Sequence, residues 1–417
     1  MSSTFTTING KSRGFFILTA TLVALSVIGI ICFMISYIKG HHVFGTSNVI
    51  PWGMPIIIAI YLIGLSAGLH ILAFLIYILG RKQWRPIIRI AVYMAIVLIF
   101  GAMISLSLDL GRPEKIWRLF MFFYLNNMTS MFAINAIFYP CYFAAASIYL
   151  IALFSEKEKF SKIAGMIAFG WAVLTHGGTG LIFGLIVARE PWFSPLKPFE
   201  FIMVAFTSSL ALLVVVMVVT FKFTHRQVRS ELVVSLGKLI ARFLCGVILL
   251  IWIGELTHIY KPHREASIFM LAGPFSWLFW GFQVFLGEII PLLILFHPSL
   301  KNTVKGVVTA SILVIIGVFF ARLYLVIPGL AYPQSYFPGK IEGVYGAIGS
   351  FSITGVESFI SLGIFALMGI FFIVGLKYLE LLPIGVTWES IETLYLNNFG
   401  RDEYLFETGE VQEEEAE

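Results

Sequence analysis

Ten long apolar runs constrain the fold of this chain more than any other feature of its sequence. A helix needs roughly 20 residues to cross the ~30 Å hydrocarbon core of a bilayer. Runs of at least that length occupy residues 15–38, 54–79, 87–108, 130–154, 162–187, 198–221, 236–260, 269–296, 303–326 and 355–380. The sequence therefore predicts an all-α polytopic membrane protein with about ten transmembrane helices.

The composition excludes a soluble domain. Hydrophobic residues make up 59% of the 417 positions, charged residues only 12%, and the mean hydropathy is +0.92. The net charge of +5 does not indicate nucleic-acid binding, because the basic residues lie in short loops between apolar runs. The three cysteines are far apart within apolar runs, which excludes a disulfide framework and a cysteine-ligated metal cluster.

The distribution of basic residues predicts the orientation. Seventeen Lys and Arg residues lie at the helix ends on the side of the amino terminus, and nine lie at the opposite ends. Cytoplasmic loops carry the excess, so both termini are expected in the cytoplasm of a multi-pass protein of the cell membrane. We divide the chain into a cytoplasmic amino terminus (1–14), a ten-helix transmembrane domain (15–380) and an acidic cytoplasmic tail (381–417). The tail ends in EEEAE and is too polar to form a core.

The predicted outer loops are longer than the cytoplasmic ones and contain Pro, Gly, Trp and Tyr. Their aromatic residues are typical of an interfacial belt at the membrane surface. They are Trp52, Trp117, Trp192, Tyr332, Tyr336 and Tyr345.

Ionisable residues at membrane depth are the first candidates for function, because they are expensive to place there. His176 lies near the start of the stretch LTHGGTGLIFGLIVAREPWFSPLKP, whose glycines permit close approach of a helix or a flat ring. Glu255 and His258 lie three residues apart on one helical face near the outer surface, where they form either a proton-accepting pair or a local ion pair. His70 is either a hydrogen-bonded packing residue or part of a proton relay.

Further charged residues are predicted near the same outer interface. Asp109 and Arg112 end the third helix in LDLGRPEK and form either a structural cap or part of a site. Arg322 lies about four residues inside the outer end of the ninth helix and either snorkels to the surface or joins the site. Glu288 and Glu357 are intramembrane residues with no role that the sequence assigns.

Several motifs then resemble a known family. The third helix ends in SLDLGRP, the fifth contains HGGTGLIFG followed by REPWFSPLKPFEF, and the ninth contains FFARLYLVIPGL followed by YFPGKIE. In this order along ten helices they resemble the membrane subunit of the polysulfide reductase superfamily, called NrfD or PsrC. Within it, the chain is most similar to the DsrP branch, from DsrMKJOP complexes or Hdr-like menaquinol oxidoreductases.

The resemblance implies a subunit of a menaquinol oxidoreductase complex and not a complete enzyme. Its second to fifth and sixth to ninth helices are expected to form two four-helix bundles, with no haem or iron–sulfur cluster in this chain. It is expected to bind menaquinone near the outer face and to exchange electrons with a periplasmic-side ferredoxin-like iron–sulfur subunit, in sulfur or sulfite metabolism. A multihaem cytochrome c and a second membrane subunit are the other implied partners.

The ionisable residues and the resemblance together predict the site. Glu255, His176 and His258 are the expected catalytic groups, and a metal site is not expected. The expected quinone-binding residues are His176, Thr179, Asp109, Arg112, Glu255 and Arg322, with Asp109 and Arg112 at the rim. Some relatives have a histidine after the loop tryptophan where this chain has Phe193.

Two other classes of membrane protein remain alternatives. A secondary transporter also has intramembrane charges, but it is expected to show broken helices at matching positions of its two halves. A membrane cytochrome needs axial histidines facing each other at one depth, whereas His70, His176 and His258 are predicted at three different depths.

Overall fold

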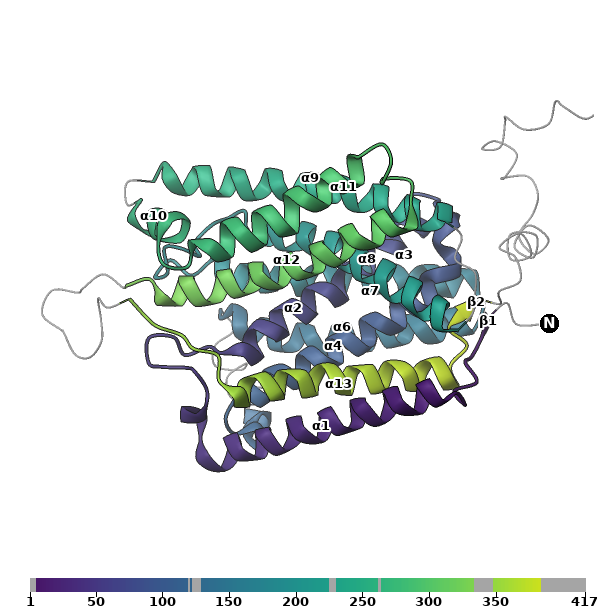
Figure 1. Ribbon diagram of the computed structural model, residues 1–417, viewed down its shortest axis with the longest axis horizontal. Helices are drawn as coiled ribbons and strands as arrows, with labels where there is room; N and C mark the ends of the chain where they lie inside the picture. Colours follow the sequence, from purple (N-terminus) through teal and green to yellow (C-terminus); the bar gives the residue numbers. More distant parts are fainter. Residues whose placement is uncertain are drawn as a thin grey trace, which may run out of the picture.

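The computed structural model describes residues 5–118, 121, 129–224, 230–261, 264–333 and 348–383. Within these residues, ten helices are long and apolar enough to cross a membrane, as the sequence predicts. They run side by side along one direction (Figure 1). A membrane-spanning helix satisfies its own backbone hydrogen bonds, which the hydrocarbon core cannot do.

Four of the ten spans form the first bundle, in which polar side chains bond helix to helix. Its elements are α2 (Met54–Gly68) continued by α3 (Ile71–Tyr77), α4 (Ile88–Asp109) preceded by η2 (Lys82–Ile87), α6 (Met131–Phe154) and α7 (Glu158–Gly184). Ser66 donates a 2.7 Å hydrogen bond to the Ala95 carbonyl, and the Tyr142 hydroxyl lies 2.9 Å from Ser66 Oγ and 3.0 Å from His70 Nδ1. His70 is thus hydrogen-bonded to α6 through Nδ1, while its Nε2 has no partner among the described residues, so its role stays a prediction.

Four further spans form the second bundle. They are α8 (Lys197–Phe223), α9 (Ser230–Ile259), the π-helix η5 (Leu278–Ile289) continued by α11 (Ile290–Phe296), and α12 (Val304–Ala331). The short helix α10 (Glu265–Ala272) lies between α9 and η5. Helix α8 contacts both α2 and α7, so it joins the two bundles. The two expected bundles are confirmed.

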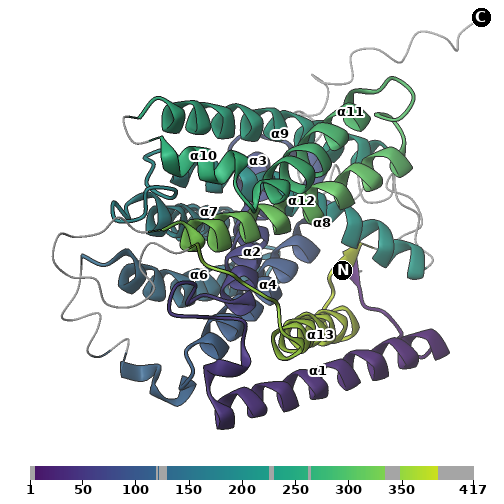
Figure 2. The same cartoon turned by 60° about the vertical axis from the view of Figure 1, so that its left-hand side comes forward.

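The first and last spans, α1 (Arg13–Lys39) and α13 (Gly355–Tyr378), pair at one edge of the molecule (Figures 1 and 2). Gly29 of α1 meets Gly363 of α13 so closely that a Cβ built on Gly29 would lie 2.7 Å from the Gly363 Cα. Small residues at such a crossing allow helix backbones to touch and gain dispersion contacts inside a membrane. Helix α1 therefore depends mainly on α13 for its contacts with protein.

Both ends of the described chain lie on one face, which we call the Arg89 face; the opposite one, which carries Trp192, is the Trp192 face. Strand β1 (Phe5–Thr6) pairs antiparallel with β2 (Leu382–Pro383) on the Arg89 face. Phe5, Leu381 and Leu382 are buried. That this face is cytoplasmic stays a prediction, and most of the expected tail, 384–417, lies outside the described residues.

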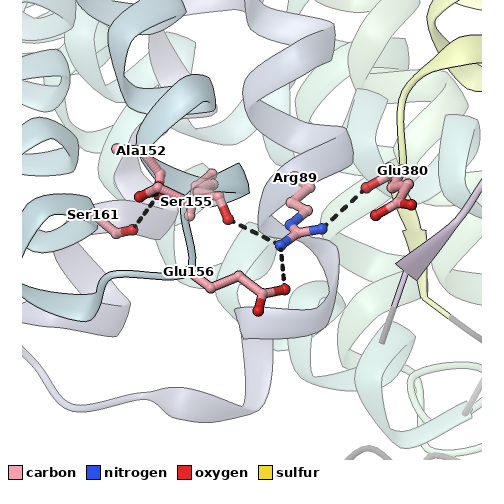
Figure 3. Close-up of polar contacts among 7 residues, drawn as sticks. Arg89, Ala152, Ser155, Glu156, Ser161 and Glu380 are labelled. Carbon is pink, nitrogen blue, oxygen red and sulfur yellow. Dashed lines mark hydrogen bonds and ion pairs between the residues drawn. The ribbon is translucent and has the colours of Figure 1, made fainter. Parts of the chain in front are cut away.

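Arg89 joins three parts of the chain on this face (Figure 3). Its guanidinium donates hydrogen bonds of 2.9 Å to the Leu153 carbonyl, 3.3 Å to the Glu380 carbonyl and 3.3 Å to Glu156 Oε1. It also lies 3.9 Å from the centre of the Phe5 ring. One side chain thereby fixes the ends of α4, α6 and α13 and the amino-terminal strand.

We expect Arg89→Met to destabilise the protein by about 2–4 kcal/mol, because it removes bonds from a charged donor and a cation–π contact. The measurement is thermal unfolding in detergent, followed by helical circular dichroism. Arg242→Met is the matched control, because Arg242 is an exposed arginine on α9, and exposed substitutions usually change stability by no more than about 0.5 kcal/mol. Equal losses for the two variants would contradict a special role for Arg89.

One predicted span is wrong in its extent, and a second is confirmed as a span but contains a break. The run 269–296 is not one helix, because α10 ends at Ala272 and η5 begins only at Leu278. The run 54–79 is interrupted between α2 and α3, where the backbone tightens at Leu69 and His70. The break between α2 and α3 lies in the first span of the first bundle, whereas the π-helix η5 lies in the third span of the second bundle. The two irregular helices are therefore not at matching positions of two halves, as a secondary transporter requires.

Candidate functional site

A cavity runs down the middle of the second bundle from the Trp192 face. About 920 Å³ of space between α8, α9, α10, η5 and α12 is free of protein atoms, a volume that includes the part open to the outside. Apolar side chains form most of its wall, among them Val204, Leu244, Val247, Ile251, Val314 and Val318. A largely apolar cavity with a few polar groups is the usual form of a small-molecule site.

Five acidic or basic side chains gather at the end of the cavity nearest the Trp192 face. They are Lys197, Glu200, Glu255, His258 and Arg322. Lys197 Nζ lies 2.9 Å from Glu200 Oε2, one turn along α8, so these two neutralise each other. The structure thus brings together three residues that the sequence nominated, Glu255, His258 and Arg322, and adds an ion pair that it did not.

Lys261 sets the state of the His258 ring. Its Nζ lies 3.2 Å from His258 Nδ1, and because an ammonium group only donates, Nδ1 accepts and a neutral ring carries its proton on Nε2. Lys261 also donates a 3.0 Å hydrogen bond to the Phe193 carbonyl. Burial lowers the pKa of Lys261, an effect that Glu190 partly offsets. Phe193 therefore contributes to this site by its backbone carbonyl, which accepts the hydrogen bond from Lys261.

Arg322 is the most unusual group in the cavity. It is only 3% exposed, and its Nε and Nη2 have no hydrogen-bond partner among the described residues. The carbon of the guanidinium lies 4.1 Å from the centre of the Phe201 ring. Snorkelling to the surface, one of the two alternatives for this residue, is wrong: the cation stays inside the bundle with donors to spare.

His176 and Thr179 lie beside the cavity, not in it. The His176 ring packs against Phe201 with centres 5.3 Å apart, and neither of its nitrogens has a partner among the described residues. Phe201 therefore contacts His176 on one side and Arg322 on the other. Thr179 donates a 2.8 Å hydrogen bond to the Thr175 carbonyl within α7 and lies 3.3 Å from the Tyr139 hydroxyl.

Asp109 and Arg112 are also separate from the cavity. They end α4 in the first bundle, where Gly111 packs against the His41 ring and Arg112 is exposed. Neither is among the residues that line the cavity. Their predicted place at a quinone rim therefore has no support from the arrangement of the described residues.

The segment between α7 and α8 covers the cavity on the Trp192 face. Pro191 lines the cavity, and Trp192 beside it is 2% exposed, donates a 2.7 Å hydrogen bond to the Leu325 carbonyl and stacks on Trp52 at 5.5 Å. Arg189 donates to the Leu330 carbonyl at 3.1 Å, and burial lowers its pKa. An interfacial belt is thus the wrong assignment for Trp192, while Tyr336 and Tyr345 lie outside the described residues.

Sequence reasoning missed the polar residues deeper in the cavity. Gln283 and Glu288 of η5 line it, although Glu288 received no role from the sequence. The periodicity of an apolar run does not predict a π-helix, so the side of η5 that faces the cavity could not be derived from the sequence. The Lys197–Glu200 pair, in contrast, was readable as opposite charges three residues apart at the start of a helix.

Comparison with known proteins identifies the family of this chain. The family described as "Polysulphide reductase, NrfD" matches residues 42–334. The chain is 34% identical over 399 residues to the "Hdr-like menaquinol oxidoreductase integral membrane subunit" of Archaeoglobus fulgidus, covering 94% of this chain and all of the relative. It is 28% identical to a selenate reductase subunit of Mesobacillus selenatarsenatis, over 78% of this chain and 83% of that protein.

A further relative is the "Menaquinone reductase, integral membrane subunit" of Nitratidesulfovibrio vulgaris, 26% identical over 73% of this chain and 80% of that protein. The family match covers most of the ten spans, and the relative from Archaeoglobus fulgidus aligns along its whole length. This multi-pass membrane protein therefore belongs to the NrfD family of polysulphide reductase membrane subunits.

Proposed function

We propose that the chain is the quinone-interacting subunit of a respiratory complex and that menaquinol or menaquinone binds in the cavity of the second bundle. The observation that carries this proposal is Arg322, a buried cation with unused donors facing a largely apolar cavity. A quinone offers carbonyl oxygens to such donors and an isoprenoid tail to the apolar wall. Two relatives are named for reactions with menaquinol or menaquinone.

The charged end of the cavity suits the chemistry of a quinol. Its oxidation releases two electrons and two protons, and the protons need acceptors beside the ring. Arg322 would orient an oxygen of the ring, while the Glu255 carboxylate would accept a proton. The His258 ring is held by Lys261 with Nδ1 already accepting, so it would serve Glu255 as a neighbour and not as the first base.

A photoreactive menaquinone analogue tests where quinone binds. We expect labels that excess menaquinone competes away to map to peptides of α8, α9, η5 or α12. Competed labels confined to the first bundle would move the site toward His176. An absence of competed labels in the intact complex would contradict quinone binding altogether.

Electrons must leave the chain to a partner, which we propose is a ferredoxin-like iron–sulfur subunit over the Trp192 face. The other proposed members of the complex are a multihaem cytochrome c and a second membrane subunit, with a role in sulfur or sulfite metabolism.

The charged end of the cavity opens toward the Trp192 face, and electron transfer favours the shortest route between the quinone and the iron–sulfur subunit. We expect cross-links to the iron–sulfur subunit from segments on this face, such as 185–196. Cross-links restricted to the Arg89 face would contradict this arrangement.

We expect Glu255→Gln to slow quinol-linked electron transfer by about 10²-fold, the usual contribution of a positioned general base, while the fold and cavity are kept. The measurement is menaquinol oxidation or menaquinone reduction by the assembled complex between pH 5 and 9. Glu200→Gln is the matched control, since Glu200 lines the same end of the cavity but is neutralised by Lys197. A near-normal rate and an unchanged pH profile for Glu255→Gln would remove Glu255 from the mechanism.

A further inference from the structure

The π-helix η5 presents a different set of residues to the cavity than an α-helix would. Its backbone bonds close every five residues, which corresponds to roughly 4.4 residues per turn instead of 3.6. Nine residues then complete about two turns, so Phe279, Gln283 and Glu288 share one face, and all three line the cavity. On an α-helix nine residues make two and a half turns, and Glu288 would point away from Phe279.

Glu288 is buried and incompletely paired. The residue is 5% exposed, and its Oε2 has no hydrogen-bond partner among the described residues. An unpaired buried carboxyl is costly, so a residue kept in this state at membrane depth is a candidate for contact with a ligand. Like Arg322, it offers an unsatisfied polar atom in the wall of the cavity.

The packing of η5 on α12 fixes the relative depth of these two groups. Gly287 and Gly317 touch backbone to backbone, because a Cβ built on Gly287 would lie 2.6 Å from the Gly317 Cα. Arg322 is five residues further along α12, about 7.5 Å nearer the Trp192 face at 1.5 Å per residue. Glu288 follows Gly287 away from that face. Among the described residues that line the cavity, buried polar atoms without a partner therefore lie at two levels: those of Arg322 and Tyr324 on α12, and that of Glu288 deeper on η5.

We infer that Glu288 is a second recognition point, and that it and Arg322 hold the two oxygens on opposite sides of one ring. This inference rests on the proposed function and deepens it. The backbone positions of the two residues are offset in depth by a length comparable with that of a six-membered ring with para oxygens and a hydrogen bond of about 2.8 Å at each end. A carboxyl group accepts from a quinol hydroxyl when ionised and donates to a quinone carbonyl when protonated, so it serves both redox states.

The five groups near the Trp192 face cannot supply this second contact, because they gather at the level of Arg322. The deep level offers Gln283 and Glu288 as its polar side chains among the residues lining the cavity. Of these, Glu288 has the atom without a partner. The ligand class that follows is a flat, para-dioxygenated ring, and a ring with one oxygen should bind less well.

The test compares two probes on the full-length chain in its complex. The probes are 2-methyl-1,4-naphthalenediol, kept reduced under anaerobic conditions, and 2-methyl-1-naphthol, which lacks one hydroxyl. We expect the unmodified protein to bind the diol at least about tenfold more tightly, the ratio associated with one good hydrogen bond. Glu288→Leu should bring the ratio close to one, and Glu288→Gln should keep part of it. Because both probes partition into detergent, the ratio of their affinities largely removes this nonspecific contribution.

Gln283→Leu is the matched control, because it removes a buried polar group from the same face of η5. We expect it to keep most of the preference for the diol, and thermal unfolding checks that each variant is folded. A preference that survives in Glu288→Leu, or that Gln283→Leu removes instead, would overturn the inference and leave the proposed function standing. Failure of the unmodified protein to bind either probe would overturn both.

Discussion

Arg322→Gln is expected to lower menaquinol-linked electron transfer at low quinol concentration by about 10²–10³-fold, because a charged hydrogen-bond donor to the ring is lost. Thermal stability should not fall. The guanidinium is buried without a carboxylate partner among the described residues, so its removal also removes an unfavourable desolvation. A large loss of turnover without a loss of stability is the signature of a residue retained for its ligand.

Two further variants sharpen this measurement. Arg322→Lys keeps the charge but loses the planar arrangement of donors, so we expect a rate between those of the unmodified protein and Arg322→Gln. Arg189→Gln is the matched control, because Arg189 binds the Leu330 carbonyl nearby and does not line the cavity. Turnover of Arg322→Gln that equals that of Arg189→Gln would argue against ligand binding by Arg322.

The second large effect is expected at Glu357, where we predict that Glu357→Ala destabilises the protein by about 3–5 kcal/mol. The carboxylate is fully buried and accepts hydrogen bonds from the backbone of Gly45 at 3.0 Å, Met54 at 3.1 Å and Thr354 at 3.2 Å. Alanine would leave these donors unpaired beside the start of α2, at about 1–3 kcal/mol for each that stays buried. The expected total assumes that water reaches part of the site.

Thermal unfolding against Ser358→Ala checks this prediction. Ser358 lies next to Glu357, and its hydroxyl only bonds back to the Thr354 carbonyl within the helix. That control should change stability by less than about 0.5 kcal/mol. Glu357→Gln keeps one accepting oxygen and should fall between the two. If Glu357→Ala lost no more thermal stability than Ser358→Ala, the hydrogen bonds of the carboxylate would not be what holds α13 to the segment before α2.

The sequence carried enough information for the number and order of the spans, because length and apolar composition alone decide whether a helix can cross a bilayer. The sequence did not predict helix boundaries correctly where the amino-acid composition stays apolar across a boundary. Residues 269–272 and most of 278–296 are apolar, so the break at Gly273 and Pro274 was absorbed into one run, although a Gly-Pro pair commonly marks a turn. The role of Glu357 was also readable, since Thr354 and Glu357 have the spacing of a capping box.

The candidate site was predicted in part, for a physical reason. Depth along a helix can be counted from the sequence, and this placed Glu255, His258 and Arg322 at one level, where the structure brings them into one cavity. Lateral position cannot be counted. Asp109 has a similar predicted depth but belongs to the other bundle, and His176 faces Phe201 because of how α7 packs on α8. The exposure of Glu288 to the cavity depends on the π-helix, which no run of apolar residues specifies.

The pairing of α1 with α13 has a consequence for biogenesis. Helix α1 is synthesised before α13 and finds its main protein partner only when α13 has been made, and β1 cannot pair until β2 follows α13. During synthesis of the eight spans in between, α1 must wait among lipids or beside the insertion machinery. Many apolar side chains of α1 are exposed and can contact lipid during this time. Closure of the fold is thus a late, post-insertion event, and a nascent chain that stops before α13 would present an unpartnered α1 to membrane quality control.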